Sequence, residues 1–222
     1  MRSTLVITAD GSPTIFVPEL NEHYHSVHGA VQESMHVFIR AGFDEAAINN
    51  ASLSILEVGL GTGFNLLLTL NAVIHNQVDV TYHAIEPFPP ANEILSAFTS
   101  AHLEQLGDGA AYFHALHQVP WEKAAVLHER FTLIKYRDTL SDFTSNSKYH
   151  LIYFDAFAPG VQPDMWKQEH FVNLFNLMHS GGILVTYCAK GDVRRAMQSA
   201  GFKVERLPGP PGKREMLRAR KI

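Results

Sequence analysis

Residues 53–64 read LSILEVGLGTGF, an apolar stretch followed by a glycine-rich turn. Residues 53–58 are mostly apolar and end at a glycine, which predicts a short buried strand. A helix is predicted directly afterwards, over residues 64–75. The turn between them carries three glycines, Gly59, Gly61 and Gly63. Glycine permits a tight turn and a close approach of the backbone, and the N–H groups at a helix start face outward. The stretch therefore predicts a ligand-binding loop at the carboxyl end of a strand.

The alternation of strand and helix continues along the chain. Further strands are predicted at residues 78–86, 131–136, 149–154 and 182–187, and further helices at residues 90–105, 168–179 and 192–199. Strands separated by helical crossovers form a parallel, doubly wound sheet. Residues 202–207 and 214–219 flank a turn rich in proline and glycine, which predicts a closing β-hairpin. The predicted fold is α/β, a seven-stranded, mostly parallel sheet with a C-terminal hairpin. It resembles the Rossmann-like fold of the class I S-adenosylmethionine-dependent methyltransferases.

The first 50 residues have a different pattern. Two extended stretches, at residues 5–8 and 13–16, flank the turn signal at Asp10 and Gly11, and an amphipathic helix is predicted from residue 30 to 47. We expect residues 1–50 to form an N-terminal extension, a β-hairpin plus a helix, packed on a methyltransferase domain of residues 51–222.

The composition and the charge distribution bear on the cellular compartment and on the kind of partner. The 222 residues contain one cysteine, Cys188, which excludes an internal disulfide and is typical of a reducing compartment. No signal peptide and no apolar run of about 20 residues is visible, so we expect a cytoplasmic protein without a membrane partner. The net charge is −4, divided into −11 before residue 187 and +7 from there on. The basic tail is either a patch that faces phosphates or a solvated surface.

Acidic residues mark the ends of the first three predicted strands. Glu57 precedes the glycines in the pattern E-x-G-x-G-x-G, which resembles methyltransferase motif I more than the dehydrogenase pattern. Glu86 ends the second strand, where a carboxylate accepts both ribose hydroxyls, and Asp138 follows the third, where it would meet the adenine amine. These residues predict an S-adenosylmethionine site formed by Glu57, Gly59, Gly61, Gly63, Glu86, Asp138 and Asp155. A tight turn, a helix-start charge and a turn-forming Asp are the structural alternatives.

Residues 154–166, FDAFAPGVQPDMW, carry the most specific pattern. They resemble the signature of the MnmC-type tRNA methyltransferase domain, and similar patterns extend from about residue 8 to residue 218. The resemblance implies methyl transfer to the aminomethyl group on carbon 5 of the wobble uridine, which yields 5-methylaminomethyl(-2-thio)uridine. The partner would be the anticodon stem-loop of tRNA. Bifunctional members add a flavin-dependent oxidase domain. The resemblance therefore predicts a stand-alone form without oxidoreductase activity, whose amine substrate comes from an upstream tRNA-modifying enzyme.

The chain departs from the family pattern at three places. Gln162 stands where the family often has Asn, and Met35 where an Arg is common. Residues 209–212, Gly-Pro-Pro-Gly, replace a Gly-Phe-Gly-Arg run. The last two changes lie in segments expected to touch RNA, so they bear on the identity of the substrate more than on the reaction.

Asp155, at the end of the fourth strand, is the predicted catalytic residue. Methyl transfer needs a neutral amine in line with the methyl group, and a carboxylate orients the amine and accepts its proton. The alternative is that Asp155 binds only the cofactor or caps a turn. Substrate contacts are predicted for Tyr24, Phe157 and Pro159, and phosphate contacts for Lys190, Arg194, Arg195, Lys213 and Arg214. We expect Trp166 to pack in the core rather than stack on a base.

No metal is expected. His23, His25 and His28 cluster, but no cysteine or paired carboxylate completes a zinc spacing. The alternatives on the same fold are a methyltransferase for another RNA or a small amine, an aminopropyltransferase, and a catalytically silent protein that binds RNA or a partner. A nicotinamide dehydrogenase is disfavoured by the acid before the glycines.

Overall fold

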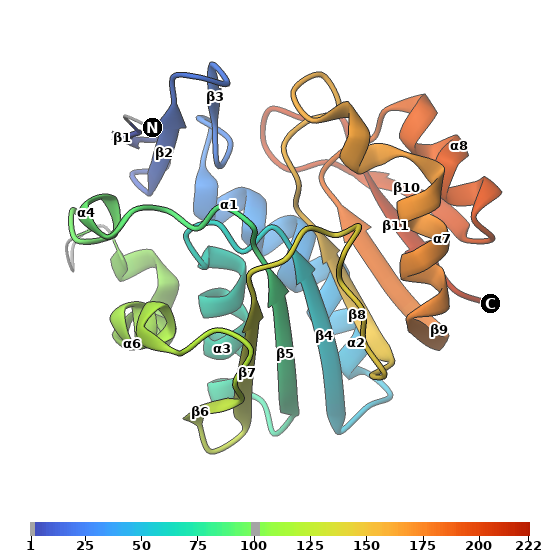
Figure 1. The fold of residues 1–222 in the computed structure, drawn as a ribbon, viewed down its shortest axis with the longest axis horizontal. Coiled ribbons are helices and arrows are strands. Elements are labelled where there is room, and N and C mark those ends of the chain that lie inside the picture. The colour runs from blue at the N-terminus through green and yellow to red at the C-terminus, as the bar shows by residue number, and fades with distance from the viewer. Residues whose placement is uncertain (1–2, 99–102) are drawn as a thin grey trace.

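The computed structural model describes residues 3–98 and 103–222 of the chain. An eight-stranded sheet forms its centre, in the order β10-β11-β9-β8-β4-β5-β7-β6 (Figure 1). In chain order these strands are β4 Ser52–Val58, β5 Asp79–Ile85, β6 Ala125–His128, β7 Phe131–Tyr136, β8 Tyr149–Phe154, β9 Met178–Thr186, β10 Lys203–Pro208 and β11 Glu215–Arg220.

The predicted α/β class and the C-terminal hairpin are confirmed. β9, β8, β4, β5 and β7 are parallel to one another, and β11 joins β9 antiparallel with β10 outside it. The predicted strand number was wrong by one, because β6 adds an antiparallel edge strand beside β7. β6 has four residues and its Val126 side chain is 72% exposed, so no buried apolar run marks it in the sequence.

Helices cover both faces of the sheet (Figure 1). Leu53 and Ile55 of β4 pack in one core, with the helix α3 Phe64–His75. Leu56 and Val58 point the other way, into a second core with α7 Gln168–Asn176 and α8 Gly191–Ser199. This alternation follows from the strand period of two residues.

The helix predicted at residues 30–47 is present as one continuous rod. It comprises α1 Ala30–Ser34, the π-helical segment η1 Met35–Asp44, and α2 Glu45–Ala47. Its start is capped from the N-terminal turn. The Ser12 hydroxyl accepts a hydrogen bond from the Ala30 N–H (3.1 Å), and Asp10 Oδ2 accepts one from the Gln32 N–H (3.1 Å). The Asp10–Ser12 turn therefore fixes where this helix begins.

The N-terminal strands form a separate three-stranded sheet of β1 Thr4–Ile7, β2 Pro13–Val17 and β3 Glu22–His23. The predicted hairpin is present, and β3 extends it. This small sheet lies over the carboxyl ends of the central strands (Figure 1). The division of the chain at residue 50 stays a prediction.

The helix predicted at residues 90–105 was wrong in its described part, and residues 99–102 of it lie outside the described residues. The structure has short pieces instead: α4 Asn92–Leu95, η2 Glu104–Tyr112 and α6 Phe113–Gln118. Gly107, at φ +61 and ψ −144, breaks the helical path of η2. The buried side chains of these short helices pack in the same core as Leu53 and Ile55. A further short helix, η3 Pro163–Trp166, precedes α7. In residues 3–98 and 103–222 no helix is long and apolar enough to cross a membrane.

Candidate active site

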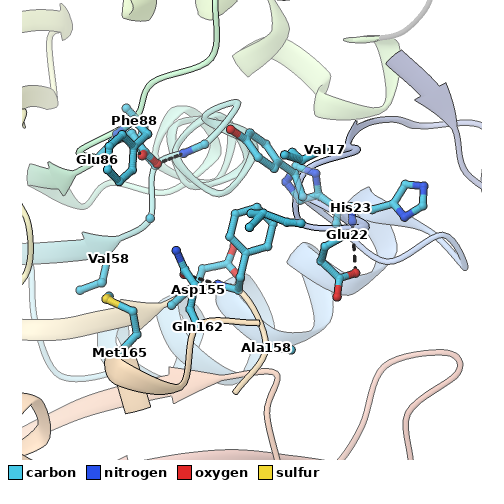
Figure 2. A pocket seen from close by; sticks show the side chains of 18 of the residues that line it. Val17, Glu22, His23, Val58, Glu86, Phe88, Asp155, Ala158, Gln162 and Met165 are labelled. Carbon is cyan, nitrogen blue, oxygen red and sulfur yellow. Dashed lines mark hydrogen bonds between the residues drawn. The ribbon is translucent and has the colours of Figure 1, made fainter. Parts of the chain in front are cut away.

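A cavity of about 560 Å³ lies at the carboxyl ends of β4, β5 and β8, beneath the N-terminal segment (Figure 2). The strand order changes direction between β4 and β8, and open α/β sheets bind ligands at such a point. Its described lining includes four carboxylic acids, Glu22, Glu33, Glu86 and Asp155. Lys213 is the one lysine or arginine among these described lining residues. The cavity is therefore suited to cationic ligands.

Two of the predicted glycines line this cavity, and both have a positive φ, which favours glycine. Gly59 has φ +93, and a Cβ there would lie 2.6 Å from the Asp155 carbonyl oxygen. Gly61 has φ +50, and the ring of Tyr24 lies 3.5 Å from the position of its Cβ. Gly63 instead caps the start of α3 in a left-handed conformation, against Leu116, away from the lining. The loop thus brings the ends of β4 and β8 together.

Glu86 joins the loop to the end of β5. Its Oε2 accepts a hydrogen bond from the Gly61 N–H (3.0 Å), and its Oε1 accepts one from the Phe88 N–H (2.9 Å) (Figure 2). Burial raises the pKa of Glu86, and these two hydrogen bonds oppose the shift. Each carboxylate oxygen keeps a second lone pair, so Glu86 still has capacity to accept two hydroxyls.

Asp155 lies on the cavity wall directly after β8. Its Oδ2 accepts a hydrogen bond from Asn65 Nδ2 (2.8 Å). Burial raises the pKa of Asp155 to about 7, Glu33 adds to the shift, and Asn65 and Lys213 oppose it. A carboxyl group with a pKa near neutrality is suited to accept a proton at physiological pH.

Glu57 does not reach the cavity lining. It is fully buried, and its Oε1 accepts a hydrogen bond from the same Asn65 Nδ2 (3.0 Å). Burial and the nearby Asp155 raise the pKa of Glu57 well above its usual range. Asn65 was not singled out in the sequence, although a polar residue within the apolar run FNLLLTL was the available signal. Asn65 therefore connects the predicted motif I acid to the predicted catalytic acid.

Aromatic residues line the cavity opposite the glycine loop. Phe157 and Tyr24 are in the lining and contact each other, with ring centroids 5.4 Å apart. Burial and Glu86 raise the pKa of Tyr24 to about 12, so its hydroxyl stays neutral. Pro159 lies outside the lining, where Ala158 takes its place. Trp166 is 6% exposed and donates a hydrogen bond to the Phe157 carbonyl (2.8 Å), as expected for a core residue.

The predicted basic residues separate into two groups. Lys213 enters the cavity, where its Nζ lies 2.5 Å from Glu33 Oε2 and 3.9 Å from the centroid of the Tyr187 ring. Outside the lining lie Lys190, Arg194, Arg195 and Arg214. Of these, Arg195 pairs with Asp192 on the same helix. Asp138 is also outside the lining, and its neighbours Thr139 and Leu140 border the cavity.

Comparisons with known proteins agree with this geometry. A family profile described as S-adenosyl-L-methionine-dependent methyltransferase matches residues 114–222. The tRNA 5-methylaminomethyl-2-thiouridine biosynthesis bifunctional proteins MnmC of Burkholderia mallei (strain SAVP1) and Burkholderia pseudomallei (strain 668) are each 30% identical over 97% of this chain. The chain spans 35% of the length of these relatives.

Solved structures are also similar to this chain. The crystal structure of MNMC2 from Aquifex aeolicus superposes with a TM-score of 0.80 at 25% identity, covering 98% of this chain and 70% of that one. DesVI from Streptomyces venezuelae shares only the fold, with a TM-score of 0.53 at 12% identity over 86% of this chain and 92% of its own. The chain is therefore an S-adenosyl-L-methionine-dependent methyltransferase, and over nearly its whole length it is similar to the MnmC type of methyltransferase domain.

Proposed function

We propose that the chain transfers the methyl group of S-adenosylmethionine to the primary amine of 5-aminomethyl(-2-thio)uridine at the wobble position of tRNA. The observation that carries this proposal is Asp155, a carboxyl group with a pKa of about 7, in a cavity next to the glycine loop. The names of the MnmC relatives, which match 97% of the chain, supply the substrate class.

The residues present fit the cofactor. The cavity volume of about 560 Å³ is in the range of small-molecule sites. Gly59 and Gly61 present no side chain to the cavity, and the Glu86 oxygens keep lone pairs that would accept two ribose hydroxyls. We assign the methionine end to the side of Gly59 and Asp155, and the adenine to the side of Asp138, Thr139 and Leu140. When bound, S-adenosylmethionine supplies an electrophilic methyl group on a sulfonium.

Asp155 handles the proton of the acceptor. An alkylammonium has no free lone pair, so it must lose a proton before it reacts. In the proposed step the ammonium would give one proton to the Asp155 carboxylate, and the freed nitrogen lone pair would accept the methyl group that the sulfonium would supply. The products would be a secondary N-methylalkylammonium, a protonated Asp155 and a neutral thioether, so charge and atoms balance. Tyr24 and Phe157, whose rings contact each other, would form one wall against which the uracil ring packs.

Phosphate contacts are proposed for Lys190, Arg194 and Arg214, which are partly or fully exposed in the C-terminal part of the chain. Arg195 is a weaker candidate for this role because it already pairs with Asp192. These contacts would position the anticodon stem-loop without reading its sequence. Losing one of them should weaken tRNA binding and reduce its dependence on salt.

The test is transfer of labelled methyl from S-adenosylmethionine to tRNA from a strain that lacks the modification, followed by nucleoside mass analysis. We expect a gain of one methyl group on the aminomethyl wobble uridine, lost in Asp155→Ala and retained in the surface control Asp164→Asn. Methylation of a different nucleoside, or of a small amine only, would reassign the acceptor. Cofactor binding without any transfer would contradict the proposed reaction.

A further inference from the structure

The end of the cavity lined by Asp155 contains a group of side chains from three distant parts of the chain. Glu33 comes from α1, Tyr187 follows β9, and Lys213 lies in the loop before β11. The Glu33 side chain is 11% exposed, and it forms the ion pair with Lys213 Nζ. The Tyr187 hydroxyl donates to the Ala156 carbonyl (2.8 Å), which fixes its ring beside the residue that follows Asp155.

The contacts of Lys213 show that this group of side chains binds an alkylammonium. Its ammonium lies against one carboxylate and over the face of one aromatic ring, which together recognise an alkylammonium. Lys213 is also electrostatically coupled to the Asp155 carboxyl. A lysine side chain ends in a primary amine on a methylene, the same chemical group as the proposed acceptor. Lys213 therefore carries into the cavity the same chemical group that the proposed acceptor would bring.

We propose that Glu33, Tyr187 and Asp155 form the acceptor subsite for a primary alkylammonium, and that Lys213 is its resident occupant, which withdraws when the acceptor enters. The inference rests on the proposed function in that the acceptor is an amine. The Lys213 side chain is 32% exposed and has a flexible four-carbon stem, so it has a route to solvent without movement of the backbone.

The exchange explains selectivity for a cationic acceptor. When one ammonium replaces another, Glu33 keeps its counter-ion and the Tyr187 ring keeps its cation. A neutral or anionic substituent at the same place would leave Glu33, which is largely buried, without a partner, and this is costly. The subsite would therefore reject tRNA whose wobble uridine carries a neutral or anionic substituent in place of the free amine.

The experiment uses the full chain and n-butylammonium, which reproduces the part of the side chain that Lys213→Ala removes. Thermal unfolding is followed with n-butylammonium chloride, and with 1-butanol plus sodium chloride as the matched neutral probe. We expect n-butylammonium to raise the Tm of Lys213→Ala, to have little effect on the wild type, and to bind the double variant Glu33→Gln/Lys213→Ala at least about tenfold more weakly. Lys203→Ala, which removes an exposed lysine of β10, controls for loss of a charge.

The second measurement asks whether the subsite is the acceptor site. In Lys213→Ala, n-butylammonium should inhibit methyl transfer competitively against tRNA. If it instead restores activity lost in this variant, Lys213 is a fixed part of the machinery and the proposal is overturned. Two Tm results would also overturn the proposal. One is that n-butylammonium raises the Tm of Lys213→Ala no more than 1-butanol does; the other is that it raises the Tm of Lys213→Ala and of Glu33→Gln/Lys213→Ala equally. The Tm measurement needs no tRNA, so it remains readable if the proposed tRNA reaction fails.

Discussion

Replacing Asp155 by Asn should make the folded protein more stable at alkaline pH and almost inactive. Burial is the main cause that raises the pKa of Asp155 from 3.8 to about 7. One pKa unit corresponds to about 1.4 kcal/mol, so the shift corresponds to at most about 4 kcal/mol against the ionised folded state. Asp155 is partly exposed toward the cavity, where water reduces this penalty, and we expect about 2 kcal/mol.

The sign follows from proton binding. The folded protein holds the Asp155 proton more tightly than the unfolded chain, because the folded pKa is the higher one. The contribution of this carboxyl to the free energy of unfolding therefore falls as the pH rises from about 4 to about 7 and stays level above that. The amide of Asp155→Asn does not titrate, so the variant should lack this part of the pH dependence.

The assay is urea unfolding of both proteins at about pH 5 and about pH 8.5, followed by circular dichroism. The stability gain of Asp155→Asn should be larger at the higher pH. Methyl transfer by the wild type should rise with pH through about 7. The kcat of the variant should be at least about 100-fold lower than that of the wild type. Asp164→Asn, on the exposed side of η3 beside Lys167, is the matched control.

Two results would contradict the role of Asp155 as a buried proton acceptor. If Asp155→Asn is no more stable than the wild type at the higher pH, burial does not disfavour the ionised carboxyl. If the variant keeps most of its methyl transfer and its rise with pH, Asp155 does not accept the proton.

Three further changes test other parts of the structure. Glu86→Gln should weaken S-adenosylmethionine binding about tenfold in calorimetry, because an amide replaces one acceptor oxygen with a donor; unchanged affinity would contradict the ribose assignment. Gly59→Ala should lower the free energy of unfolding by about 2 kcal/mol or more, since its Cβ would lie 2.6 Å from the Asp155 carbonyl at φ +93; a two-state urea titration decides this. Asp10→Ala should cost about 1 kcal/mol in the same titration through loss of the α1 cap, and a neutral result would show that water replaces it.

The local elements and their order could be predicted from the amino-acid sequence. The strands at residues 131–136 and 149–154 and the helix at residues 64–75 have the predicted bounds. These segments combine a clear apolar period with glycine or charged residues at their ends, and both signals act over a few neighbouring residues. The ligand end of the sheet could be predicted for the same reason, because parallel strands place their carboxyl ends on one edge.

Which side chains face the cavity depends on tertiary packing and could not be predicted from the sequence. Glu57 follows the strand alternation to the side of α3, where Asn65 binds it, and so it lies behind the cavity wall. Lys213 meets Glu33 across 180 positions of sequence, because the closing hairpin returns the chain to the start of α1. Neither arrangement can be predicted from the local spacing of apolar residues. Each depends on how the sheet, the N-terminal helix and the hairpin pack against one another.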